Sequence, residues 1–370
     1  MKKKKINIVI TGAKGFIASN LISHLQSNNK HEIFKVVKNT KENILKDYLL
    51  KSHYIFHLAG ENRPLNKKLF KKNNELFTKK ICEILIKNKI KSKFIYISST
   101  QAPLRTAYGF SKLNSENIVK KFSRKNKSQV CIIRLANVFG KWARPNYNSF
   151  VATLCHRIPI NKSFFVKNNI INLIYIDDVV KGLIGLLNRS KLNLYEKITP
   201  IYKMNIMNIV NLIKKFNSEP KNLYVDDLGS GFKKKLYSTF LSFLPKKNWF
   251  YKIKNNSDKR GKFLEFTKTT TSGQISLFSI NPFQTRGNHY HHTKNEKFYI
   301  FNGKIKILLK NILTNKRYEV LQNSKDSKVF RSIPGWAHTL KNLTSNTIYG
   351  VVWSNEIFNK KKPDTIKELL

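Results

Sequence analysis

The stretch INIVITGAKGFIA, residues 6–18, is an apolar strand that runs into a glycine turn and then into the start of a helix. Gly12 permits the tight turn, and Gly15 lets the backbone approach a pyrophosphate where free helical N–H groups favour anions. Ala18 takes the third small position, where helix packs on strand. This order predicts a dinucleotide-binding turn. The expected cofactor contacts are Gly12, Lys14, Gly15, Phe16 and Ile17.

Two different patterns of secondary structure follow along the chain. Up to about residue 190, apolar strand runs alternate with helical stretches, which predicts an α/β fold with a Rossmann-type, doubly wound parallel sheet. Residues from about 245 to 355 contain short strands and turns, which predicts an all-β sandwich or barrel. We therefore expect domains at 1–244 and 245–370, with the tail 360–363 as a solvated end. The expected parallel strands are Ile6–Ile10, Ile33–Val37, Tyr54–Leu58, Phe94–Ile97 and Val130–Leu135.

Composition bounds the class of protein. With 370 residues, of which 41% are hydrophobic and 12% aromatic, the chain can build packed cores, so a disordered chain is excluded. The three cysteines, Cys82, Cys131 and Cys155, are far apart, which indicates a reducing compartment and no disulfide framework. The apolar run after the basic start is too short for a signal peptide, and no stretch reaches about 20 apolar residues. We expect a soluble cytoplasmic protein without a membrane partner.

The net charge of +49 is the largest compositional anomaly. It could indicate a nucleic-acid partner or an acidic membrane surface. However, the lysines are spread over the whole chain, and no helix-turn-helix, zinc-finger or RNA-recognition motif accompanies them. We interpret the charge as compositional bias and expect no nucleic-acid partner, although such a charge also suits an acidic small molecule such as a nucleotide.

The end of the second strand predicts the type of dinucleotide. NAD-binding proteins place an acid there to accept from the ribose 2′-hydroxyl, whereas this chain has Val36-Val37-Lys38-Asn39. With a cation and no acid, Lys38 suits the 2′-phosphate of NADPH. The next strand ends in His57 followed by small or apolar residues, which let a dinucleotide lie across the sheet. Its expected cofactor contacts are Leu58, Ala59 and Gly60.

A hydroxyl run and a tyrosine–lysine pair carry the predicted chemistry. Ser98-Ser99-Thr100 ends the fourth strand, and Tyr108 and Lys112 follow at i, i+4 spacing on one helix face. A nearby ammonium favours the phenolate and lowers the tyrosine pKa, which makes Tyr108 a general acid/base. Thr100 or Ser99 could hydrogen-bond the same carbonyl oxygen. Tyr108 and Lys112 are also expected to contact the cofactor.

These motifs resemble the extended short-chain dehydrogenase/reductase family, whose members act on nucleotide sugars. The resemblance implies Thr100, the third residue of the hydroxyl run, as the catalytic hydroxyl. The segment Arg134–Gly140 matches the family's RxxNVYG motif, and Ile174–Val179 matches its YVDDV motif. The loop from Thr100 to Tyr108 is short, which leaves open which hydroxyl acts. The substrate contacts that the resemblance implies are Asn137, Lys141 and Arg144.

A second set of chemical residues lies in the C-terminal part. His289 and His291 point to one face if they lie in a strand, and Glu296 and His338 could complete a site of three nitrogens and one carboxylate. That donor set suits Zn²⁺ or another divalent metal with positions left open for substrate. The spacing predicts a metal site with His289, His291, Glu296 and His338 as ligands.

Two resemblances bear on this site. The pattern HxH-x4-E-x6-G followed by PG-x2-H resembles the cupin family, in which the same four positions hold a metal on a small β-barrel. The segments Asp258–Gly261 and Arg286–Tyr290 also resemble the cupin-fold dTDP-sugar 3,5-epimerases, which use no metal and in which the position of His289 is the base. His289 is therefore either ligand or base, and we favour the ligand.

The segments GKWARPNYNS (140–149), GNHYHHTKNEKF (287–298) and NEIFNKKKPDT (355–365) extend the resemblance to the bifunctional capsular-polysaccharide enzymes of the CapF family. It implies a UDP-2-acetamido-2,6-dideoxy-hexos-4-ulose that the cupin domain epimerises at C3 and the NADPH domain reduces at C4, on the route to UDP-N-acetyl-L-fucosamine. It also implies a homodimer through the cupin domain. The alternatives are a 4-reductase or epimerase whose cupin only dimerises or binds substrate, an NADP-sensing regulator, and a charge-driven nucleic-acid binder.

Overall fold

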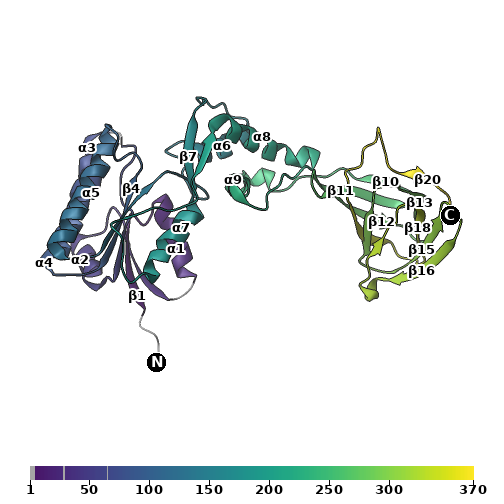
Figure 1. Ribbon diagram of the computed structural model, residues 1–370, viewed down its shortest axis with the longest axis horizontal. Helices are drawn as coiled ribbons and strands as arrows, with labels where there is room; N and C mark the ends of the chain where they lie inside the picture. The colour runs from purple at the N-terminus through teal and green to yellow at the C-terminus, as the bar shows by residue number, and fades with distance from the viewer. Residues whose placement is uncertain (1–4, 28–29, 65) are drawn as a thin grey trace. The chain divides into compact units, whose positions relative to one another are not determined.

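The computed structural model describes residues 5–27, 30–64 and 66–370 (Figure 1). Contacts divide the chain into two compact units. The first contains residues up to 214 together with 235–245, and the second contains 215–234 and 246–370. Residues 215–234 join the second unit through a short backbone ladder, in which Val225 donates to Lys268 and Lys268 donates to Leu223, each at 2.8 Å. Whether the chain can be divided at 244 stays a prediction.

A six-stranded parallel sheet forms the centre of the first unit. Its strand order is β2-β1-β3-β4-β5-β8, and every neighbouring pair is parallel. The predicted Rossmann-type, doubly wound sheet is thereby confirmed. The strands are β1 (Ile6–Thr11), β2 (His31–Val36), β3 (Tyr54–His57), β4 (Lys93–Ser99), β5 (Val130–Leu135) and β8 (Tyr195–Glu196).

Helices cover both faces of this sheet. Because successive strand residues point to opposite faces, Ile8 and Ile10 of β1 enter one core while Val9 enters the other. The first core packs against α1 (Phe16–Gln26) and α7 (Ile176–Gly185). Burying each such aliphatic side chain contributes about 2 kcal/mol to folding. The second core packs against α2 (Glu42–Lys51), α4 (Phe77–Lys87) and α5 (Ala107–Asn126).

A smaller three-stranded sheet continues from the main one. Only Ala136 separates β5 from β6 (Asn137–Phe139), so residues from 137 onward start at the carboxyl end of the main sheet. β6 pairs in parallel with β7 (Ile170–Tyr175), which pairs antiparallel with β9 (Tyr202–Asn205). The short helix α3 (Lys68–Phe70) runs into a π-helical turn (Lys71–Leu76), and the longer helices that follow are α6 (Phe150–Arg157), α8 (Ile206–Asn222) and α9 (Gly231–Ser242).

The second unit consists of two antiparallel sheets, drawn in green to yellow in Figure 1. The expected all-β architecture is confirmed. Side chains from both sheets, such as Phe278 of one and Leu340 of the other, share one apolar core. One sheet is β10 (Asn256–Asp258), β11 (Gly261–Thr269), β12 (Gly273–Ile280), β19 (Ile348–Ser354), β14 (Glu296–Ile300) and β17 (Phe330–Arg331); the other is β16 (Arg317–Asn323), β15 (Lys304–Asn311), β18 (Trp336–Asn342), β13 (Thr285–Tyr290) and β20 (Ile366–Lys367).

The last strand returns to the part of the sheet that carries the histidines. In β20, Lys367 pairs with His289 and Ile366 with Tyr290 of β13. On the opposite edge of β13, His289 pairs with His338 of β18. Within the described ranges, no helix has the length and apolar character that crossing a membrane requires.

Candidate functional site

The glycine turn after β1 packs directly on the end of β3. Gly12 has φ +67°, and a Cβ there would lie 2.8 Å from the Cα of Ala59. Any side chain at this position would therefore be strained and would clash with backbone. Gly15 precedes α1 without a side-chain cap, so the first N–H groups of that helix are open to an anion. Lys14 is exposed beside it, and Phe16 and Ile17 are half-buried.

A buried histidine fixes the loop that follows β3. His57 lies between two threonines, with Nδ1 2.7 Å from Thr11 Oγ1 and Nε2 2.8 Å from Thr78 Oγ1. The Ala59 N–H donates to Thr11 at 3.1 Å, so this chain of contacts positions the predicted cofactor contacts Leu58 and Ala59. Burial, assisted by the charge of Lys112, lowers the pKa of His57 to about 3. His57 is therefore a neutral positioning group.

Lys38 lies two residues beyond the end of β2 and is exposed. The carbonyl of Val36 accepts from the N–H of Ala13 at 3.1 Å, which places the end of β2 beside the glycine turn. The Val37 N–H donates to Thr40 Oγ1 at 2.8 Å and closes the turn behind Lys38. The location of Lys38 is compatible with its predicted role, which stays a prediction.

Tyr108 lies in the first turn of α5 and is half-buried. The hydroxyl that hydrogen-bonds to it belongs to Ser99. Thr100 is exposed, and its backbone N–H donates to Leu135 at 3.0 Å. The ring of Phe70 lies 5.9 Å from the Tyr108 ring, between centroids. Of the two hydroxyls that the sequence left open, the geometry therefore favours Ser99 over Thr100.

The pKa of Tyr108 is raised, contrary to the expectation from its i, i+4 spacing with Lys112. Burial raises that pKa, and the hydrogen bond with Ser99 offsets only part of the rise. The Lys112 ammonium, on a side chain only 6% exposed, donates to the Ile97 carbonyl at 2.8 Å and to Tyr96 at 3.3 Å. Burial lowers the pKa of Lys112 to about 8. A Cβ at Gly60 would lie 3.4 Å from this ammonium, so Lys112 is adjacent to a predicted cofactor contact.

The short loop between Ser99 and Tyr108 depends on a glycine. A Cβ at Gly109 would lie 2.3 Å from the Leu104 carbonyl and 2.5 Å from the Gln101 carbonyl. Thr106 caps α5 by accepting from the Gly109 N–H at 2.9 Å. The loop therefore folds tightly over the first turn of the helix.

An ion pair between the buried Glu116 and the half-buried Arg134 holds α5 against the sheet. Glu116 is 0% exposed and binds Arg134 of β5 through two contacts, at 2.9 and 2.7 Å. Ser98 donates to the same carboxylate at 2.6 Å. Burial alone would raise the pKa of Glu116, but the hydrogen bonds from Arg134 and Ser98 lower it. Arg134 therefore has a structural partner, and its motif positions the helix that carries Tyr108.

The three predicted substrate contacts have different surroundings. Asn137 is exposed and donates to the Asn172 carbonyl at 3.2 Å. Lys141 forms an ion pair with Asp177. The Arg144 guanidinium stacks on Tyr147, 5.0 Å from the ring centroid. Lys141 thus already has an acidic partner within the protein, whereas Arg144 is held by stacking on the Tyr147 ring.

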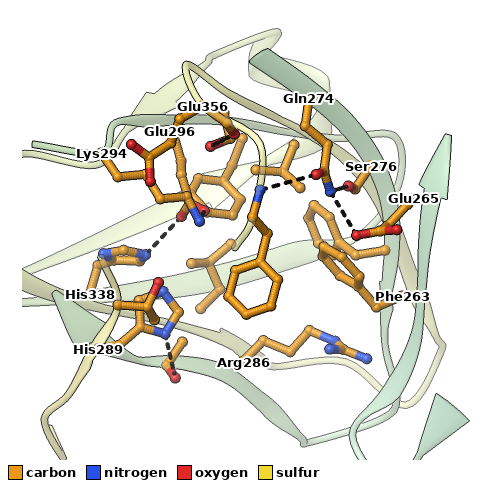
Figure 2. Close-up of a pocket in the computed structure, with 18 of the residues that line it drawn as sticks. Phe263, Glu265, Gln274, Ser276, Arg286, His289, Lys294, Glu296, His338 and Glu356 are labelled. Carbon is orange, nitrogen blue, oxygen red and sulfur yellow. Dashed lines mark hydrogen bonds and ion pairs between the residues drawn. The ribbon is translucent and has the colours of Figure 1, made fainter. Parts of the chain in front are cut away.

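The second unit contains a cavity of about 420 Å³ between its sheets. Figure 2 shows His289, Glu296 and His338 on one side of it and Glu265, Gln274 and Ser276 on the other, with Arg286 beside them. Gln274 donates to Ser276 at 2.9 Å and to Glu265 at 3.4 Å. The apolar part of the cavity wall is formed by Phe263, Phe278, Phe298, Leu340 and Val352.

The four predicted metal ligands come together at this cavity. One ligand atom from each of His289, His291, Glu296 and His338 lies within 4.8 Å of all the others. Glu296 Oε2 is 3.3 Å from His291 Nε2 and 3.5 Å from His338 Nε2. His291 and His338 are each 1% exposed. Strand pairing of β13 with β18 and the return of the chain into β14 create this convergence.

The charge state of the cluster fits a cation. Burial lowers the pKa of His289 to about 4. Burial opposes ionisation of Glu296, but its polar contacts with His291, His338 and the Lys294 ammonium hold its pKa well below the usual value. Within the described residues, both ring nitrogens of His338 are buried and lack a hydrogen-bond partner. Such orphaned nitrogens beside a carboxylate are a suitable donor set for a divalent metal.

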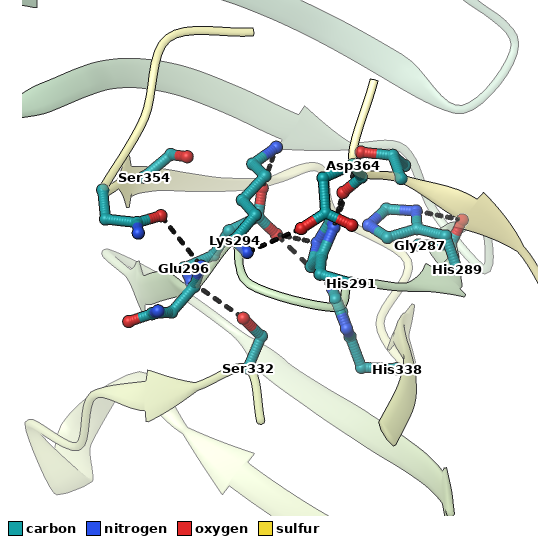
Figure 3. A network of polar contacts seen from close by, with 12 residues as sticks. Gly287, His289, His291, Lys294, Glu296, Ser332, His338, Ser354 and Asp364 are labelled. Atoms are coloured by element: carbon teal, nitrogen blue, oxygen red, sulfur yellow. Dashed lines mark hydrogen bonds and ion pairs between the residues drawn. The ribbon is translucent and has the colours of Figure 1, made fainter. Parts of the chain in front are cut away.

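Backbone carbonyls orient two of the histidines (Figure 3). His289 Nδ1 lies 3.1 Å from the Gly287 carbonyl, and His291 Nδ1 contacts the Asp364 carbonyl. Because a carbonyl only accepts a hydrogen bond, Nδ1 carries the proton in both rings. The lone pair of Nε2 is then available to bind a metal. The buried Lys294 binds the other oxygen of Glu296 at 2.9 Å.

Comparison with known proteins identifies the family. Residues 8–197 match the model of the NAD dependent epimerase/dehydratase family, and residues 256–366 match the polysaccharide biosynthesis C-terminal domain. The chain belongs to the NAD dependent epimerase/dehydratase family. The polysaccharide biosynthesis domain lies in the second unit. The chain therefore contains both the glycine turn and the histidine cluster.

Two relatives of this epimerase/dehydratase chain extend over both of its units. It is 36% identical to UDP-2-acetamido-2,6-beta-L-arabino-hexul-4-ose reductase of Pseudomonas aeruginosa, covering 97% of this chain and 98% of the relative. The capsular polysaccharide assembling protein CapF of Staphylococcus aureus is 36% identical, with a TM-score of 0.92 over 99% of this chain and all of that one. The resemblance to CapF is thus confirmed. UDP-glucuronic acid 4-epimerase of Bacillus cereus, 20% identical with a TM-score of 0.51, covers 57% of this chain and 84% of its own and shares the fold alone.

Three residues that contact the two candidate sites were not predicted from the sequence. His57 resembled an ordinary strand end, and Lys294 was one basic residue among 70 Lys and Arg. Asp364 follows the tail 360–363, which was expected to be solvated and is exposed. The signal that could have indicated Asp364 is its acid character directly after four residues with three lysines and a proline.

Proposed function

We propose that the chain reduces C4 of a UDP-linked 2-acetamido-2,6-dideoxy-4-keto sugar with NADPH, after epimerising the same sugar at C3 in a cupin-type C-terminal domain. The observation that carries this proposal is full-length similarity to UDP-2-acetamido-2,6-beta-L-arabino-hexul-4-ose reductase, covering 97% of this chain. The two side-chain constellations described above supply the chemistry that each step needs.

For reduction, a nicotinamide cofactor supplies the hydride, and the protein must supply the proton. Burial keeps the Tyr108 phenol protonated at neutral pH, because its pKa is raised. A phenol in this state can donate its proton to the oxygen that develops at C4. Ser99, hydrogen-bonded to Tyr108, can orient the same oxygen. Lys112, adjacent to Gly60, is located to contact the cofactor.

For cofactor choice, the proposal of NADPH rests on Lys38. It is exposed beyond β2, next to the glycine turn that would hold the pyrophosphate. An ammonium at this position complements the 2′-phosphate of NADPH and offers nothing specific to the 2′-hydroxyl of NADH.

For epimerisation, the C4 ketone makes the C3 hydrogen acidic. His289, His291, Glu296 and His338 would hold a divalent cation, and three nitrogens with one oxygen favour Zn²⁺. Such a cation supplies Lewis-acid polarisation of the ketone when bound. One proton leaves C3, and another, exchangeable with solvent, is delivered to the opposite face. The step therefore balances without an oxidant or a reductant. Arg260 and Arg286 line this cavity and provide positive charge for a diphosphate.

We also propose that the chain is a homodimer through this C-terminal domain. The edge strand β16 leaves three apolar side chains exposed, with Tyr318 at 60%, Val320 at 48% and Leu321 at 67%. An unpaired edge with exposed apolar residues favours association with a second strand or sheet. The partner that fits is a second copy of the chain.

The test is incubation of the protein with the UDP-4-keto-6-deoxy amino sugar and NADPH, with product stereochemistry determined by NMR. We expect an alcohol at C4 and inversion at C3. An alcohol with unchanged C3 would instead support the alternative of a 4-reductase whose C-terminal domain binds substrate or dimerises. Absence of NADPH oxidation would contradict the proposed function.

A further inference from the structure

The C-terminal segment folds back onto the loop that connects two of the four clustered side chains, His291 and Glu296. Asp364 precedes β20, which pairs with the histidine strand β13. Its carboxylate accepts from the backbone N–H groups of His292 at 2.9 Å, Thr293 at 2.7 Å and Lys294 at 2.8 Å, and from the Thr293 hydroxyl at 3.0 Å. Figure 3 shows Asp364 directed at this loop. One carboxylate therefore satisfies three consecutive backbone donors.

The loop held in this way is the short connection between His291 and Glu296. It spans residues 292–295, so its conformation decides where these two side chains point. Three of its four N–H groups are bound by Asp364, and the fourth, of Asn295, donates to the Asn355 side chain at 2.9 Å. With its donors bound from outside, the loop is held in the conformation that brings His291 and Glu296 to 3.3 Å.

Asp364 reaches both side chains by separate routes. Its backbone carbonyl accepts from His291 Nδ1, which leaves Nε2 directed at the cluster. Its carboxylate holds the backbone of Lys294, and the Lys294 ammonium binds Glu296 Oε1 at 2.9 Å, which leaves Oε2 for the cluster. A single residue far along the chain thus orients two donor atoms.

We propose that Asp364 is a positioning residue of the metal site, through which the C-terminal segment sets the affinity of the second unit for a divalent metal. This inference rests on the metal-binding part of the proposed function. Outer-shell partners of this kind fix the tautomer and orientation of ligands, and their loss typically weakens metal binding roughly 10- to 100-fold.

The experiment measures Zn²⁺ binding to the purified full chain by competition with a chromogenic chelator. Asp364→Asn keeps the shape but places an amide N–H group against backbone N–H groups. Glu368→Gln is the matched control, because Glu368 lies in the same segment and pairs with Lys310 at 2.6 Å, away from the cluster. We expect Asp364→Asn to bind Zn²⁺ roughly 10- to 100-fold more weakly and Glu368→Gln to bind it like the unmodified chain.

Two further measurements separate positioning from folding. The thermal midpoint of each metal-free protein shows whether the variant folds, and the visible absorption of Co²⁺-loaded protein reports ligand geometry. We expect altered Co²⁺ bands in Asp364→Asn alone. If this variant does not fold without metal, Thr293→Ala, which removes one hydrogen bond to the carboxylate, takes its place and should still weaken Zn²⁺ binding.

Unchanged Zn²⁺ affinity and Co²⁺ bands in a folded Asp364→Asn variant overturn the inference and leave the proposed function intact. Equal weakening in Glu368→Gln also overturns it, since the effect would then belong to the whole segment. Absence of Zn²⁺ binding to the unmodified chain contradicts the metal-binding part of the proposed function and the inference together.

Discussion

Ser99 provides the hydroxyl that hydrogen-bonds to the phenol of Tyr108, while its neighbour Thr100 is exposed. The short loop explains this arrangement, since the Gln101 N–H donates to Ser99 Oγ at 3.1 Å and the chain turns immediately after the strand. A hydroxyl that both contacts the phenol and orients the substrate oxygen has to lie on the Tyr108 side of that turn. We therefore propose Ser99 for the role that the family resemblance implied for Thr100.

The first prediction compares these two hydroxyls. Ser99→Ala should lower kcat for NADPH-dependent reduction by roughly 10²- to 10³-fold, the usual effect of removing one donor to a developing oxyanion. Thr100→Ala should retain most of the activity. Steady-state kinetics of both variants is the measurement. The opposite ranking would return the role to Thr100 and show that the loop rearranges when ligands bind.

The second prediction concerns the proton donor. Tyr108→Phe removes the phenolic hydroxyl and keeps the ring that packs near Phe70. NADPH oxidation should fall by roughly 10²-fold or more, the scale of general acid catalysis. Cofactor binding, followed by quenching of protein fluorescence, should persist. Turnover close to that of the unmodified protein would contradict the reductase assignment.

The sequence predicts much of this architecture because the decisive signals are local. The turn at Gly12 and the strand–helix alternation depend on neighbouring residues, and both occur as expected. The convergence of His289 with His338 could be predicted from motif spacing, although strand pairing creates it. The spacing of Tyr108 and Lys112, by contrast, could not show that the lysine binds the Ile97 carbonyl.

Contacts between segments that are distant in the sequence could not be predicted from local patterns. Asp364 binds residues about 70 positions earlier, and nothing near it in the sequence specifies that partner. His57 resembles a structural strand residue until Thr11 and Thr78 are seen on its two nitrogens. Buried hydrogen-bond networks depend on tertiary packing, which residue spacing does not encode.

The third prediction tests the cofactor type through Lys38. Lys38→Asp replaces a cation near the expected 2′-phosphate with an acid, which repels phosphate and can accept from a 2′-hydroxyl. KM for NADPH should rise more than KM for NADH. The measurement is kcat/KM for both cofactors in both proteins. Preference of the unmodified protein for NADH would show that the interpretation of the second strand is wrong.

The fourth prediction uses the ionisation of Lys112. Burial lowers its pKa to about 8, so the ammonium is charged below pH 8 and neutral above it. If this charge attracts the anionic cofactor, kcat/KM for NADPH, which reports the free enzyme, should fall as the pH rises through 8. Lys112→Met should be poorly active and should lack this decline. A flat profile up to pH 9 in the unmodified protein would contradict the role of the charge.

The fifth prediction separates the two sites. His291 and His338 are both buried in the cluster of the second unit, and Tyr108 belongs to the first unit. Replacing both histidines with Ala should abolish Zn²⁺ binding and stop solvent deuterium from entering C3 of the 4-keto sugar. NADPH-dependent reduction should survive and yield the unepimerised alcohol, because Tyr108, Ser99 and Lys112 are unchanged. Metal analysis and NMR of the product are the measurements.

If the unmodified protein contains no metal and still exchanges deuterium at C3, the ligand role of His289 is wrong. Its Nε2, left free by the Gly287 carbonyl, would then be the base, as in the metal-free epimerases.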